Sequence, residues 1–103
     1  MFSKKANCNI FLAMQRIEFI ISQSVDEIFT QLCEKYQVGK FYTRIPNVTG
    51  NGFSGAKLGT EENPGLNNMY IIYAPKEDIP VFKKIIETLR TQYPDAGVAC
   101  FLS

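Results

Sequence analysis

MQRIEFIIS, at residues 14–22, is the stretch that decides the fold of this chain. Its side chains alternate with a period of two, which is typical of a strand that buries one face. We therefore predict a strand here, with three apolar residues on its core-facing side. These are Ile17, Phe19 and Ile21.

A helix is predicted directly after this strand, over residues 25–36, because apolar residues there recur at three- and four-residue steps. Ser24 and Glu27 have the spacing of a capping box, in which each side chain satisfies a helix amide. Gly39 lies just past the predicted end, where a left-handed residue is often required.

Three more strands and a second helix complete the pattern. Residues 40–48 and 68–74 are rich in aromatic and β-branched residues, and residues 98–102 have the same character, so all three segments predict strands. Pro46 cannot donate to a ladder, which places its end of the strand at an edge, a bulge or the base of a loop. Residues 79–93 carry an apolar stripe of helical period.

The resulting order, βαββαβ, predicts an α+β fold of the ferredoxin-like type. Right-handed crossovers then put both helices on one face of a four-stranded antiparallel sheet. The alternation assigns one set of side chains to the helix-covered face and another to the uncovered face. The first set is Ile17, Phe19, Phe41, Ile71, Val98 and Cys100, and the second is Ile20, Tyr42, Tyr70, Ile72 and Phe101.

The uncovered face is expected to pack against another subunit. A monomer rarely exposes a contiguous apolar patch larger than about 300–600 Å². A mixed face that a monomer tolerates is the alternative, and the sequence leaves it open.

The composition argues against several classes of function. We expect the chain of 103 residues to hold one domain, at residues 14–103, after an N-terminal extension at residues 1–13. The net charge of +1 gives little reason to expect nucleic acid as a partner. There is no histidine, no metal-ligand spacing among the three cysteines, and no nucleophile paired with a base. We therefore expect no catalytic residues and no metal site. The N-terminal apolar run is too short for an export signal, so a cytoplasmic location is expected.

The segment TGNGFSGAKLGTEENPGLNN, residues 49–68, is the candidate functional part. It holds five of the seven glycines, and connections longer than about 12–15 residues without structure of their own are usually functional or disordered. Glycines let backbone amides turn inward around a phosphate or carboxylate. The pattern is not a Walker loop, and its GxGxxG match leads into more loop rather than a helix, which speaks against dinucleotide binding.

VTGNGFSGAKLG and NPGLNNMYIIYAP, together with the βαββαβ order, resemble the PII-like signalling proteins over residues 14–103. The resemblance implies a homotrimer whose clefts between subunits bind adenine nucleotides or other small effectors. It also implies that the long loop docks onto a membrane transporter, a channel or an enzyme. The ligand-binding positions that it implies are Thr43, Arg44, Gly50, Asn51, Gly52, Gly55, Lys57, Gly59, Gly65 and Asn67.

One segment departs from that family. Residues 91–98 lack the lysine and most of the glycines with which ATP-binding members hold phosphates, so a different nucleotide or another anion is an open alternative. A metal-tolerance trimer of the same fold is a second alternative. A third is an RNA-binding sheet that uses Tyr42, Tyr70 and Phe101 as stacking platforms.

Overall fold

The structure is a computed structural model, and it describes residues 14–52, 55–57, 59 and 65–102. The predicted N-terminal extension, residues 1–13, lies outside the described residues. The elements in chain order are β1 (Met14–Ser22), α2 (Gln23–Lys35), β2 (Tyr42–Val48), β3 (Gly50–Gly52), β4 (Gly55–Lys57), β5 (Asn67–Pro75), a 3₁₀ turn (Lys76–Asp78), α3 (Ile79–Gln92) and β6 (Val98–Leu102).

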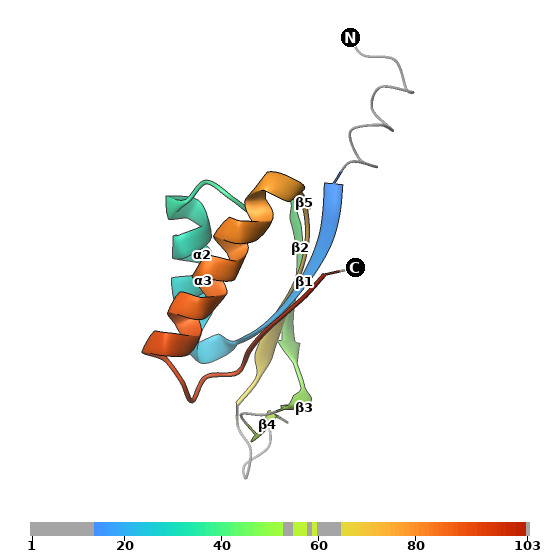
Figure 1. Ribbon diagram of the computed structural model, residues 1–103. Coiled ribbons are helices and arrows are strands. Elements are labelled where there is room, and N and C mark those ends of the chain that lie inside the picture. The colour runs from blue at the N-terminus through green and yellow to red at the C-terminus, as the bar shows by residue number, and fades with distance from the viewer. Residues whose placement is uncertain (1–13, 53–54, 58, 60–64, 103) are drawn as a thin grey trace.

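Four of the strands form one antiparallel sheet in the order β2-β5-β1-β6. Both helices pack on the same face of that sheet (Figure 1). The fold is therefore the predicted α+β, ferredoxin-like sandwich. β2 is an edge strand, and its pairing with β5 shifts register between Ile45 and Val48, so Pro46 lies at both an edge and a bulge.

The core lies between the sheet and the helices. Phe19 is fully buried in the middle of β1, and its ring centroid lies 5.1 Å from that of Phe29 in α2 and 5.2 Å from that of Phe82 in α3. One aromatic side chain of the central strand thus contacts both helices. Tilted ring pairs at this separation add about 0.5–1.5 kcal/mol beyond the area that they bury.

Two of the predicted strand faces are wrong. Tyr70 and Ile72 of β5 are 3% and 2% exposed, and Tyr70 packs on Phe29 of α2, so they face the helices. Ile71 therefore points the other way. The alternation of β2 is inverted with it: Tyr42 pairs with Ile72 on the helix side.

The face without helices carries mostly apolar side chains, and we call it the open face. In the register of the four strands its rows are Phe41, Tyr73 and Arg16; then Thr43, Ile71, Glu18 and Phe101; then Ile45, Met69, Ile20 and Ala99. Phe41, which was expected on the helix side, is 66% exposed, and Phe101 is 54% exposed, so large apolar side chains meet solvent in the isolated chain. Ile20 and Phe101 lie on this face as predicted, and Ile17, Phe19, Val98 and Cys100 lie on the other.

The first helix begins earlier than predicted. Its first residue is Gln23, after Ser22 at the N-cap position, and Ser24 already lies within the helix. The predicted capping box is therefore absent, and the Ser24 hydroxyl instead lies 3.0 Å from the hydroxyl of Ser22. The end of the helix is closer to expectation, because Gly39 has a φ of 73°, although Gln37 takes a left-handed conformation first, with a φ of 56°.

We predict that replacing Phe19 by alanine lowers the free energy of unfolding by about 3–5 kcal/mol, because the cavity would separate β1 from both helices. Chemical denaturation followed by circular dichroism, at a fixed chain concentration, measures the change. Phe19→Leu keeps most of the volume and serves as the control, with a clearly smaller expected loss. Equal stability of Phe19→Ala and the wild type would contradict the central place of this ring in the core.

Candidate functional site

The described part of the segment at residues 49–68 contains two short strands, which its composition does not suggest. β3 and β4 form an antiparallel hairpin in which Gly50 pairs with Lys57 and Gly52 with Gly55. This hairpin projects from the end of the sheet, away from the helices, as Figure 1 shows. The chain therefore continues from β2 into a two-stranded hairpin made of β3 and β4, which we call the arm.

A bulge separates this arm from the sheet. Asn47 has a φ of 60°, a left-handed conformation that asparagine tolerates better than most residues. After it, pairing with β5 resumes at Val48 and Asn67. The backbone of β2 is thereby re-aimed immediately before the hairpin, as is typical of bulges near functional sites.

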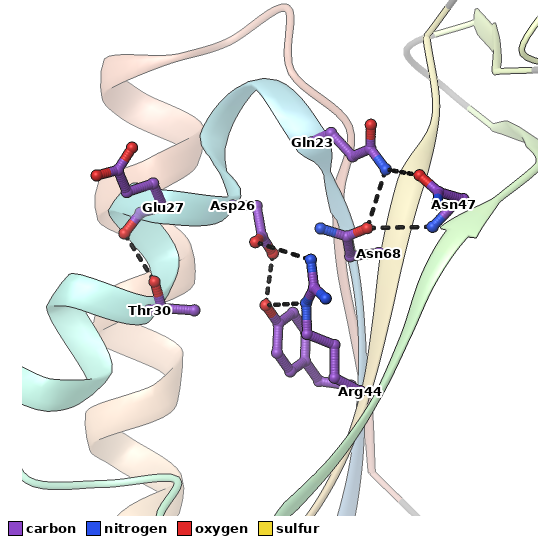
Figure 2. A network of polar contacts seen from close by, with 8 residues as sticks. Gln23, Asp26, Glu27, Thr30, Arg44, Asn47 and Asn68 are labelled. Carbon is purple, nitrogen blue, oxygen red and sulfur yellow. Dashed lines mark hydrogen bonds and ion pairs between the residues drawn. The ribbon is translucent and has the colours of Figure 1, made fainter.

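Three side-chain amides hold the base of the arm, and we call them the amide cluster (Figure 2). The Gln23 side-chain amide donates to Oδ1 of Asn47 at 2.6 Å and to Oδ1 of Asn68 at 3.1 Å. The same Asn68 oxygen accepts the backbone N–H of Asn47 at 3.2 Å. Because Asn68 is 2% exposed, this cluster ties the bulge to the first residue of α2 and to β5.

The far side of the arm base is closed by a backbone contact. Gly59 donates its N–H to the carbonyl of Gly65 at 3.2 Å. Its φ is +66°, and a Cβ there would lie 2.8 Å from Cδ2 of Leu66. The left-handed backbone conformation therefore favours glycine at this position, whereas the Leu66 methyl lies at the end of a flexible side chain and can shift.

A charged network lies nearby on the helix side of β2. Tyr70 donates to Oδ1 of Asp26 at 2.6 Å, Arg44 Nε donates to the Tyr70 oxygen at 3.2 Å, and the Arg44 guanidinium lies 3.8 Å from Oδ2 of Asp26 (Figure 2). Burial first, and the hydrogen bond to Asp26 second, raise the pKa of Tyr70 to about 12. The network joins α2 to β2 and β5 below the arm, and it places a carboxylate against the arginine that the resemblance assigns to ligand binding.

The structure brings only part of the predicted ligand set together. Thr43 lies on the open face and Arg44 on the helix face, so these neighbours in sequence cannot contact one ligand from the same side of the sheet. Asn67 is 8% exposed at the start of β5. The positions in or beside the arm are Gly50, Asn51, Gly52, Gly55, Lys57, Gly59 and Gly65.

Sequence reasoning missed Gln23, Asp26 and Asn47 as parts of the site. Their contacts span long stretches of chain, and nothing in the local pattern of a helix start marks Gln23 or Asp26 as a partner of a distant loop. Asn47 did carry a signal: an asparagine directly after Pro46 at a strand end is typical of a turn or bulge.

A cavity of about 330 Å³ opens between α2 and the edge of the sheet. The ring of Tyr42 and the thiol of Cys33 line it, with Lys40 also in its wall. Burial raises the pKa of Cys33 to about 12, so this thiol stays protonated and unreactive at neutral pH. Across the described ranges, no three acidic or thiol groups come together as a metal site.

The predicted RNA-stacking surface is not formed, because Tyr70 is buried and Tyr42 lies on the face opposite Phe101.

Neither helix of the described part of the chain is long and apolar enough to cross a membrane.

We predict that Asn68→Ala lowers the free energy of unfolding by about 1–3 kcal/mol, because the Asn47 N–H and the Gln23 amide lose a shared, buried acceptor. Native-state hydrogen exchange should show faster exchange of the Asn47 amide. Gln31→Ala is the matched control, since the Gln31 amide makes one exposed bond, of 3.4 Å, to Glu27 on the same helix. Unchanged exchange at Asn47 would contradict the anchoring role of the cluster.

A pH dependence follows from Tyr70. The folded chain holds the phenol proton more tightly than the unfolded chain, where the pKa is about 10, so the stability that Tyr70 contributes is complete below pH 10 and is lost as the pH rises toward 12. In Tyr70→Phe the free energy of unfolding should fall less between pH 10 and pH 12, because the titrating phenol is gone. The variant also lacks the Tyr70 hydrogen bonds at neutral pH. Denaturation of both proteins between pH 8 and pH 11.5 tests the difference, because the contribution of Cys33 is common to both. Parallel curves would overturn the assignment.

Comparison with known proteins gives a result at the level of structure alone. No protein-family model matches the sequence, and no curated protein is significantly similar to it. Several solved structures match. CPII, a nitrogen regulatory PII-like protein from Thiomonas intermedia K12, matches in complex with ADP, AMP and bicarbonate, with a TM-score of 0.66, 22% identity, and coverage of 87% of this chain and 83% of that one.

Two further structures agree. The apo form of CPII gives a TM-score of 0.60 at 18% identity, over 87% of this chain and 86% of that one. A protein from Thermus thermophilus, described as PII-like, gives 0.56 at 15% identity, over 87% and 84%. The expected resemblance is therefore confirmed in three dimensions: the chain has the fold of the PII-like proteins.

Proposed function

We propose that this chain is a PII-like regulatory protein that works by binding and not by catalysis. In this proposal three copies associate through their open faces, a small anionic effector binds in the clefts between copies, and the arm at residues 49–68 docks onto a partner protein in the cytoplasm. The observation that carries the proposal is the combination of the PII-like fold with a glycine-rich arm anchored at its base.

Association is supported by the open face. Its exposed residues include Phe41, Phe101 and Tyr73, the last of them 44% exposed, and no element of the described chain covers them. Burying apolar surface is worth about 25 cal/mol per Å², so a face of this kind favours assembly. A copy of the same chain is the partner that a PII-like fold favours.

The effector is proposed to be an adenine nucleotide or a comparable small anion. CPII, which shares the fold, is known in complex with ADP, AMP and bicarbonate. In this chain the hairpin arm contributes a glycine-rich backbone at Gly50, Asn51 and Gly52, and the sequence adds one positive charge at Lys57. Arg44 donates to Tyr70 and lies 3.8 Å from Asp26, so we assign it a structural part in the site.

Partner docking is assigned to the arm because it projects from the sheet and its base is fixed. A rigid base with a glycine-rich end lets the arm take different conformations with and without an effector, and a partner can distinguish these conformations. A membrane transporter, a channel or an enzyme is the class of partner that we propose.

We predict that ADP or AMP raises the melting temperature of the wild-type protein, because a ligand at 100 times its dissociation constant stabilises the folded state by about 2.7 kcal/mol. Calorimetric titration with AMP, ADP, ATP and bicarbonate identifies the effector, and light scattering gives the mass for comparison with three chains of 11.7 kDa. Lys57→Ala is expected to weaken nucleotide binding without changing the mass. Glu87→Ala, on the exposed side of α3, is the control. No binding of any of the four ligands would remove the effector part of the proposal.

A further inference from the structure

One ion pair stands among the apolar side chains of the open face. Arg16 donates through a terminal guanidinium nitrogen to Oε1 of Glu18 at 2.8 Å, and both residues lie on β1, an inner strand of the sheet. They are the only charged side chains that the described strands place on this face. A charged pair on a surface that is otherwise suited to burial needs an explanation.

Within one chain this pair is incompletely bonded. Arg16 has five N–H donors, and one of them is used for Glu18. The Nε atom is shielded from solvent and has no acceptor among the described residues. The two side chains are 41% and 29% exposed, so solvent still satisfies the outer nitrogens and the carboxylate in the isolated chain.

Covering the open face would remove that solvent. An arginine and a glutamate taken out of water need further hydrogen bonds, because the cost of desolvation otherwise exceeds their mutual attraction. The neighbouring copy must therefore supply acceptors for Arg16 and donors for Glu18. The surface contains both in equal number, which makes it complementary in charge to a rotated copy of itself.

We propose that Arg16 and Glu18 form a closed ring of alternating charges across the assembly, in which each Arg16 binds the Glu18 of its own chain and the Glu18 of the next copy. In this ring the part-exposed guanidinium of Arg16 donates to the carboxylate of the neighbouring copy. This proposal rests on the association assigned above, and it goes further by naming the groups that fix how the copies are oriented. Burial of the apolar rows favours association but does not fix how the copies are oriented. The ring of charges stabilises one orientation over the others.

Charge reversal tests the ring. Arg16→Glu leaves two glutamates per copy on the open face, and Glu18→Arg leaves two arginines. Each single variant is expected to lose assembly in light scattering or analytical ultracentrifugation, with at least a roughly tenfold rise in the concentration needed to associate, the effect of about 1.4 kcal/mol. The double variant R16E/E18R restores alternating charges in the opposite order and is expected to regain the wild-type mass.

Circular dichroism of each variant shows whether the chain is folded. Thr43→Glu serves as a second control, because it places a charge on the open face and leaves Arg16 and Glu18 intact. Assembly of both single variants at the wild-type mass and concentration would overturn the ring. So would a folded double variant that stays monomeric, since a ring needs only alternation. A wild-type chain that is itself monomeric overturns both the ring and the proposed association, whereas nucleotide binding is measured separately and can fail without affecting either.

Discussion

The antiparallel pairing of β1 with β5 is the constraint on which the rest of the structure depends. It runs from Met14 opposite Pro75 to Ser22 opposite Asn67. Because successive side chains point to opposite faces, this register determines which residues enter the core with Phe19 and which lie on the open face. It also fixes the position of Asn68 beneath the arm, and hence the amide cluster that holds the arm base.

The pairing explains which parts of the fold can be predicted from the sequence. β1 alternates between charged and apolar residues from Arg16 to Phe19, and Ile20 then departs from the pattern, so its bounds and its buried face are both predictable. β5 contains NMYIIYA, with large apolar residues at both parities, so the pattern gives no preference between its faces. The choice is made by cross-strand contact: Tyr70 lies opposite Phe19 and follows it into the core, where its hydroxyl donates to Asp26. No local rule contains that information.

In the candidate site, too, some features can be predicted from the local sequence and others depend on contacts between distant residues. Glycine content marks residues 49–68 as unusual, but it does not predict the hairpin within them, because a three-residue strand of Gly-Asn-Gly carries almost no strand signal. Thr43 and Arg44 are adjacent in the predicted ligand set, yet adjacency in a strand means opposite faces. The anchors Gln23 and Asn68 come together across 45 positions of sequence.

The left-handed backbone at Asn47 has a further consequence for how copies of this chain can meet. β2 is an outermost strand, and an unbroken outermost strand is a template onto which foreign or identical chains add by main-chain bonding. The bulge and Pro46 interrupt that template within a few residues and remove one of its donors. Addition of a further strand at the β2 edge is thereby discouraged, so contact between molecules on this side of the sheet is directed to side chains and not to main-chain pairing.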